Sequence, residues 1–190
     1  MSTEHRVAVI GGGSFGTVIA NIVAANGHAV SLWMRNAEVA RTVNSERVNA
    51  AYLPDYPLHH GLRATTDLAD AVADVDVLFM AVPSSSCRQV AREVGKHLDA
   101  QAVVISMTKG IEVLGDERPE HSLGVLSGPN LAREIADGQL TGTVIASADE
   151  ALVQLVQGLL HSGNFRVYAS HDMYGVELGG ALKNVYAIMA

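Results

Sequence analysis

Short apolar runs alternate along the chain with segments whose apolar residues recur at helical spacing. The runs are continuous, which is typical of strands buried on both faces of a parallel sheet. Such runs predict strands at 6–11, 27–35, 74–83, 102–107, 123–127, 142–147 and 165–170. Helical spacing predicts helices at 14–26, 36–46, 84–98, 130–136, 149–160 and 172–190.

This alternation predicts an α/β protein with a Rossmann-type, doubly wound and mostly parallel sheet that helices cover on both faces. Residues 48–66 contain prolines and a glycine and favour a long loop. The last helix runs to Ala190 through the apolar stretch LKNVYAIMA without a C-cap signal. We therefore expect the chain to be one piece of a longer protein.

Composition and charge remove several classes of function. Of the 190 residues 48% are hydrophobic, which is enough for a substantial core. The net charge of −7 is spread along the chain without a basic face, so we expect no nucleic-acid partner. Residues 1–6 are too short and polar for a signal peptide, and no apolar run has the length of a membrane span. We expect a cytoplasmic protein with no membrane insertion.

Gly11, Gly13 and Gly16 form the pattern G-x-G-x-x-G directly after the first predicted strand and at the start of the first helix. The first glycine permits a tight turn, the second lets the backbone approach a pyrophosphate, and the third lets helix pack on strand. Unpaired N–H groups at the helix N-terminus then meet the phosphate charge. A glycine-rich turn without a ligand is the alternative, but the strand–turn–helix context favours a dinucleotide.

The second predicted strand indicates which dinucleotide is bound. Proteins restricted to NAD usually carry Asp or Glu about 20 residues past the glycines, yet no carboxylate occurs from Val30 to Asn36. Arg35 stands where a guanidinium can pair with a 2′-phosphate, although a solvated surface arginine is the alternative reading. We expect NADP or NAD, with NADPH favoured.

Lys109 follows the predicted strand 102–107, at the carboxyl edge where open α/β sheets bind ligands. Residues 83–86 end another strand at that edge and are expected to line the same crevice. A solvated loop lysine is an equally good reading of Lys109 from position alone.

Lys183 is the only charge between Leu178 and Ala190. Gly179 and Gly180 precede it, and each interior glycine costs a helix about 1 kcal/mol relative to alanine. Something is therefore expected to approach the backbone there. A lysine in apolar surroundings can have a lowered pKa and transfer a proton, while snorkelling to the surface is the alternative.

The stretch Ser127-Gly128-Pro129-Asn130 predicts a strand end that turns into a helix, with Asn130 as N-cap. Backbone N–H groups there could bind a phosphate or carboxylate, but an ordinary capped turn explains the stretch equally well. The histidines do not cluster at metal-ligand spacing, so we expect no metal. Cys87 lacks an evident base partner and is expected to be structural.

A series of motifs follows the chain in a fixed order: GGGSFGT, LWMRN, YLP, ATTDL, AVPS, TKGIE, LSGPN, FRVY and GVELGGALKNVYAI. Together they closely resemble bacterial NAD(P)-dependent sn-glycerol-3-phosphate dehydrogenases. The resemblance implies a dinucleotide-binding Rossmann domain over residues 1–171. It further implies that residues 172–190 are the first helix of a C-terminal helical substrate domain, whose remainder is absent beyond Ala190.

The resemblance implies NAD(P)H-dependent reduction of dihydroxyacetone phosphate to sn-glycerol 3-phosphate for glycerophospholipid synthesis. It assigns Lys183 as the catalytic lysine that protonates the developing alkoxide, with Lys109 orienting the ligands and stabilising negative charge. Family members are often dimers, which suggests a homodimer for the full-length protein, but the sequence leaves its oligomeric state open. The cofactor contacts expected are Gly11, Gly13, Ser14, Phe15, Gly16, Arg35, Tyr52, Lys109 and Ala132, and the substrate contacts are Lys109, Gly128, Asn130 and Lys183.

Two features depart from the family's pattern. Asn130 stands where Ser or Thr is typical, and the connection at 112–122 is shorter than the helical one expected. Because the helical domain is absent, we expect this chain to bind dinucleotide and the complete protein to carry out turnover. The rival functions are a ketopantoate-reductase-like 2- or 3-hydroxyacid reductase and a non-catalytic dinucleotide-binding module.

Overall fold

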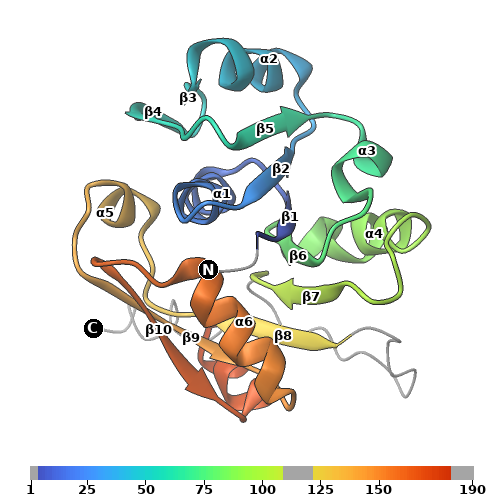
Figure 1. Cartoon of the computed structure of the whole chain (residues 1–190), viewed down its shortest axis with the longest axis vertical. Coiled ribbons are helices and arrows are strands. Elements are labelled where there is room, and N and C mark those ends of the chain that lie inside the picture. Colours follow the sequence, from blue (N-terminus) through green and yellow to red (C-terminus); the bar gives the residue numbers. More distant parts are fainter. Residues whose placement is uncertain (1–3, 109–121, 181–190) are drawn as a thin grey trace.

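The main sheet has eight strands in the order β10-β9-β8-β7-β6-β1-β2-β5 (Figure 1). The computed structural model describes residues 4–108 and 122–180, and among the described strands of this main sheet only β8 and β9 pair antiparallel. The Rossmann-type, mostly parallel sheet expected from the apolar runs is confirmed. Its strands are β1 (Arg6–Ile10), β2 (Ala29–Trp33), β5 (Leu62–Thr65), β6 (Val77–Met80), β7 (Val103–Ser106), β8 (Leu123–Ser127), β9 (Thr141–Ala146) and β10 (Phe165–Ser170).

Helices cover both faces of the sheet, because the central strands are apolar on both sides. In β1, Val7 and Val9 pack into one core cluster with α1, α2 and α6, whereas Ala8 and Ile10 pack into a second with α3 and α4. Phe79 in β6 is fully buried in the first cluster. The helices are α1 (Ser14–Ala25), α2 (Ala37–Glu46), α3 (Leu68–Val72), α4 (Ser84–Val94), α5 (Ala132–Ala136) and α6 (Glu150–Leu160), and residues 173–180 are also helical.

The expectation of a long loop at 48–66 is wrong. This stretch forms a short antiparallel hairpin, β3 (Val48–Asn49) and β4 (Leu53–Pro57), followed by β5 at the edge of the main sheet. In β5, Leu62 and Ala64 are buried while Arg63 is exposed, so the strand does alternate, but over too few residues to stand out. The prolines lie in the hairpin, outside the main sheet, where a missing N–H is tolerated.

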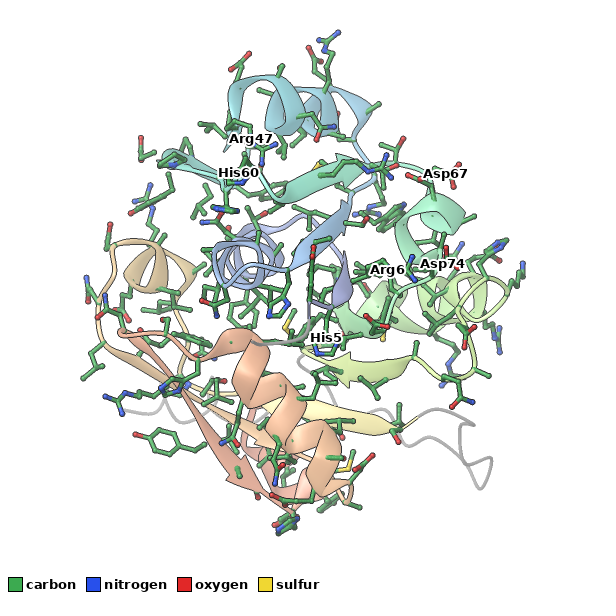
Figure 2. All side chains as sticks on the ribbon, viewed as in Figure 1. His5, Arg6, Arg47, His60, Asp67 and Asp74 are labelled. Atoms are coloured by element: carbon green, nitrogen blue, oxygen red, sulfur yellow. The ribbon has the colours of Figure 1, made fainter. Side chains whose placement is uncertain are left out.

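Arg47 fixes the entry to this hairpin. It ends α2 in the left-handed region with φ 57°. Its guanidinium donates to the carbonyl oxygens of His59 and Leu62, the latter at 2.8 Å. Figure 2 labels Arg47 and His60 on this upper part of the molecule. The side chain of one residue therefore ties the end of a helix to the loop that precedes β5.

Ion pairs gather at the amino edge of the sheet. Arg6, at the start of β1, pairs with Asp74 at 3.5 Å, and His5 lies 3.6 Å from Asp76. Figure 2 labels His5, Arg6 and Asp74 together here, and Asp67 apart from them where its side chain caps α3. The opposite, carboxyl edge is left open. None of the helices in the described ranges combines the length and apolar character needed to span a bilayer.

Candidate functional site

A groove of about 890 Å³ follows the carboxyl ends of the central strands. Its walls include the residues that come directly after β1, β2, β6 and β7, namely 11–13, 34–36, 81–84 and 107–108. The chain passes from β1 outward to β2 and β5, then crosses back to β6 on the other side of β1. Open α/β sheets bind ligands at such a reversal of strand order, so this groove is the expected ligand site.

The glycine turn forms one end of the groove wall. Gly11 has φ +127°, and a Cβ there would lie 2.5 Å from the carbonyl oxygen of Ala81, so no other residue fits this conformation. A Cβ on Gly16 would overlap the carbonyl oxygen of Gly11, which shows how closely α1 approaches the turn. Gly13, in contrast, has open space where its Cβ would be. The turn is closed on the protein side and bare on the groove side.

The start of α1 is electrically suited to an anion. Gly13 is its N-cap and supplies no side-chain hydrogen bond to the first turn, and no acidic residue lies there. The first backbone N–H groups of a helix have no partner within the helix and carry partial positive charge. Together with the open space at Gly13, they favour a phosphate at this point.

Arg35 supplies positive charge farther along the groove. Its side chain is exposed, and among the described lining residues it is the one cation. The other charged lining residue, Glu93, is paired with Lys96 at 2.7 Å. Tyr52, whose side chain is 55% exposed, lies on the hairpin wall. A second anionic group of the ligand would therefore be attracted towards the end of β2.

A second cavity of about 50 Å³ adjoins the groove, and the two share Phe15, Met107 and Thr108 as lining residues. Its other walls include Gly128 and Asn130 after β8. The antiparallel pairing of β8 with β9 places these residues next to Thr143. The structure thus brings Gly128 and Asn130, two of the four residues expected to contact substrate, to one end of the groove expected to hold cofactor.

Asn130 does not cap α5, contrary to the expectation from sequence. Leu131 is the N-cap, without a side-chain hydrogen bond. Asn130 instead is 8% exposed and donates from Nδ2 to Oγ1 of Thr143 at 3.0 Å. Its Oδ1 is buried and has no hydrogen-bond partner among the described residues. Asn130 thus lines the small cavity, but its Oδ1 has almost no exposed surface.

The helical residues 173–180 close the small cavity, through Glu177 and Gly180. A Cβ on Gly180 would overlap Oγ of Ser127 at the end of β8. The sequence predicts that some group approaches the backbone near Gly179 and Gly180. At Gly180 this group is the side chain of Ser127, which belongs to the protein itself. Lys183 and Lys109 lie outside the described residues.

The remaining sequence assignments separate into two groups. Gly11, Gly13, Phe15, Arg35 and Tyr52 all line the groove. Ser14, Gly16 and Ala132 do not line either cavity. Ser14 donates from Oγ to the carbonyl oxygen of Tyr52 at 2.9 Å, and Ala132 is the first residue of α5.

Sequence reasoning missed two polar residues at the site. Thr108 lines both cavities and donates from Oγ1 to the carbonyl oxygen of Val82 at 3.1 Å. Its position between a predicted strand and Lys109 could have marked it as a site residue. Asn49 is completely buried beside the glycine turn. Nothing local marks it, because it lies in the segment expected to be a loop.

Comparison with known proteins gives concordant matches. The sequence model of the family described as NAD-dependent glycerol-3-phosphate dehydrogenase N-terminus matches residues 6–153. The chain is 52% identical to glycerol-3-phosphate dehydrogenase [NAD(P)+] of Teredinibacter turnerae and 51% identical to that of Azotobacter vinelandii, covering all of this chain and 58% of each relative. A crystal structure of glycerol-3-phosphate dehydrogenase from Coxiella burnetii superposes with a TM-score of 0.91 at 33% identity, covering 97% of this chain and 59% of that one. The chain thus spans somewhat more than half the length of these relatives.

Proposed function

The chain belongs to the family of NAD-dependent glycerol-3-phosphate dehydrogenases, matching its N-terminal part, and we propose that its groove binds NADP(H) or NAD(H). One observation carries the proposal: the glycine turn opens into the groove at the reversal of strand order. Contact with Ala81 excludes a side chain at Gly11, whereas the space beside Gly13 is open. The pyrophosphate is assigned to Gly13 and the first turn of α1. Arg35 is assigned to the 2′-phosphate, which favours NADPH.

For the complete protein we propose reduction of dihydroxyacetone phosphate to sn-glycerol 3-phosphate, which provides the backbone of glycerophospholipids. When bound, the dinucleotide supplies the hydride for the carbonyl carbon. Gly128 and Asn130, which both line the small cavity, are assigned to the substrate. This placement puts substrate beside Phe15, at one end of the groove.

Two lysines complete the proposed chemistry. Lys183 donates a proton to the carbonyl oxygen as it becomes an alkoxide. Lys109 orients the ligands and offsets negative charge. Both assignments come from the family resemblance. Thr108 and Gly180, the described residues next in sequence to the two segments that carry these lysines, line the small cavity.

The proposal extends to the organisation of the complete protein. Residues 1–171 form the dinucleotide-binding domain, and residues 172–190 begin a helical substrate domain. Ala132 would then contact cofactor from α5. The complete protein is proposed to be a cytoplasmic homodimer.

The decisive experiment measures turnover by the complete protein. Dihydroxyacetone phosphate is supplied with NADPH and, separately, NADH, and oxidation is followed by the nicotinamide absorbance. Oxidation dependent on dihydroxyacetone phosphate supports the proposal. Oxidation with 2-ketopantoate instead would identify a different reductase, and cofactor binding without turnover of either compound would identify a non-catalytic module.

A further inference from the structure

Asn49, the last residue of β3, is fully buried against the glycine turn. Its Nδ2 donates to the carbonyl oxygen of Gly12 at 3.0 Å and to Oγ1 of Thr17 at 2.8 Å. The Thr17 hydroxyl lies 3.4 Å from the same Gly12 carbonyl. The Gly12 carbonyl is therefore held towards the protein interior by a side chain from another element.

The orientation of that carbonyl decides where the next N–H points. Peptide bonds are planar and trans, and the described residues contain no cis peptide, so the N–H of Gly13 points away from the Gly12 carbonyl. The Gly12 carbonyl faces the interior, and Gly13 lines the groove with open space beside it. The N–H of Gly13 is therefore directed towards the groove.

A peptide between two glycines has little conformational preference of its own. Neither Gly12 nor Gly13 has a Cβ to restrict rotation, so this peptide can turn over at low cost unless an external bond holds it. Turned over, it would present a carbonyl oxygen to the bound phosphate in place of a donor. The bond from Asn49 opposes that rotation.

The turn of the hairpin also contacts Ser14, the residue that follows Gly13. The N–H of Tyr52 donates to the carbonyl oxygen of Asn49 at 3.2 Å, and Oγ of Ser14 donates to the carbonyl oxygen of Tyr52 at 2.9 Å. Residues 49–52 thus bond to both neighbours of Gly13. The hairpin acts as a brace for the glycine turn.

Asn49 also carries a cost that packing alone does not explain. Its Oδ1 is buried without a hydrogen-bond partner among the described residues. An unpaired buried acceptor is destabilising, whereas an apolar side chain of similar size would avoid that cost. The amide is best explained by what its Nδ2 does.

We propose that Asn49 is a positioning residue of the dinucleotide site: by holding the Gly12 carbonyl it fixes the Gly13 N–H as a donor to the pyrophosphate. The inference rests on the proposed cofactor role of the groove. It assigns Asn49 no contact with the ligand, because Asn49 does not line the groove.

The test compares Asn49→Ala with Asn44→Ala. Asn44 is a matched control because its amide also bonds to backbone, donating to and accepting from Ala64 at 2.8 Å, and it does not line the groove. Dissociation constants are measured for ADP-ribose, which carries the diphosphate, and for adenosine, which has no phosphate. Thermal unfolding reports the stability of each variant.

Asn49→Ala is expected to weaken ADP-ribose binding about tenfold, the loss of one hydrogen bond to a charged group. Adenosine binding is expected to stay unchanged, and Asn44→Ala to alter neither ligand. Unchanged ADP-ribose binding, or an equal loss for adenosine, would overturn the inference. If the original chain does not bind ADP-ribose at all, it is the proposed cofactor role that fails.

A spectroscopic measurement on the original chain covers the case in which Asn49→Ala does not fold. Addition of ADP-ribose is expected to shift the Gly13 amide proton resonance downfield, as a new hydrogen bond to phosphate requires, while adenosine leaves it in place. Binding of ADP-ribose without that shift would contradict the proposed donor.

Discussion

Gly11 and Gly13 lack a side chain for opposite reasons. At Gly11 the backbone conformation and the carbonyl of Ala81 exclude a Cβ, so the residue is fixed by the protein itself. At Gly13 the backbone is extended, with φ −72°, and the space around it is open. The protein could accept a side chain at Gly13, and only a ligand would exclude it.

This difference predicts the behaviour of Gly13→Val. The variant is expected to fold with little loss of stability, because neither strain nor overlap arises at that position, but to lose NADPH binding because the side chain fills the phosphate site. Fluorescence titration and thermal unfolding measure the two effects. Gly163→Val is the control, since Gly163 also has open space but lies away from the groove. Normal NADPH binding by Gly13→Val would refute the assignment of the pyrophosphate.

Arg35→Ala is expected to weaken NADPH binding by about ten- to a hundredfold and to leave NADH binding nearly unchanged. Loss of hydrogen bonds to a charged 2′-phosphate has this magnitude, and NADH carries no such group. Isothermal titration with each dinucleotide gives the comparison. Arg63→Ala serves as the control, because Arg63 is an exposed arginine on β5, paired with Asp70 outside the groove. An equal loss for both dinucleotides would remove Arg35 from the recognition of the 2′-phosphate.

Among the secondary-structure elements, those with a long apolar run or a sustained helical spacing of apolar residues could be predicted from sequence. Strands β1, β6 and β7 and helices α1 and α6 were expected near their observed ranges, because burial on both faces of a central sheet demands such runs. The elements at 48–66 could not be found, since β5 has only four residues and takes its place by pairing with β2. Helix α3 could not be predicted either, because it has only five residues.

The residues of the candidate site also divide into those that could be predicted from sequence and those that could not. Glycines 11, 13 and 16 and Arg35 follow from local rules on strand ends and helix starts. Asn49 and the actual role of Asn130 depend on contacts with residues far along the chain, Gly12 and Thr143. A buried amide in an apparent loop looks like an ordinary polar residue until the packing is known.

Helix α6 provides a test of stability against pH. Asp149 caps it by accepting from the N–H of Ala151 at 2.9 Å, and Oγ of Ser122 donates to its other oxygen at 3.0 Å. The hydrogen bond from Ser122, followed by that from the backbone of Leu152, lowers the pKa of Asp149 below the ordinary 3.8. Because the folded state favours the carboxylate, its contribution is fully present above pH 3.8 and is lost as pH falls through the lowered pKa.

Asp149→Asn is therefore expected to be less stable than the original chain at neutral pH. The difference in stability is expected to shrink as the pH falls below 3.8 and through the lowered pKa of Asp149. Urea unfolding across pH measures the difference. Ser122→Ala is expected to raise the pKa of Asp149 towards its ordinary value in a carboxyl titration by NMR. A stability difference that does not change with pH would show that the carboxylate charge plays no part in the cap.

At the scale of the whole molecule, the proton donor Lys183 is assigned to residues 172–190, outside the proposed dinucleotide-binding domain. In the complete protein, Lys183→Ala is expected to lower kcat by about a hundredfold or more, as loss of a general acid does, while the dissociation constant of NADPH changes little. Steady-state kinetics and cofactor titration give the two values. Retained turnover would exclude Lys183 as the proton donor.

The strand order also bears on how the protein is synthesised. The walls of the groove come from both sides of β1, and the last described wall residue along the chain is Thr108. A nascent polypeptide leaving the ribosome thus exposes its glycine turn long before β6 and β7 can enclose it. Nucleotide capture at this groove therefore requires β6 and β7 to have emerged, but not β8, β9 or β10, which supply none of its described wall residues.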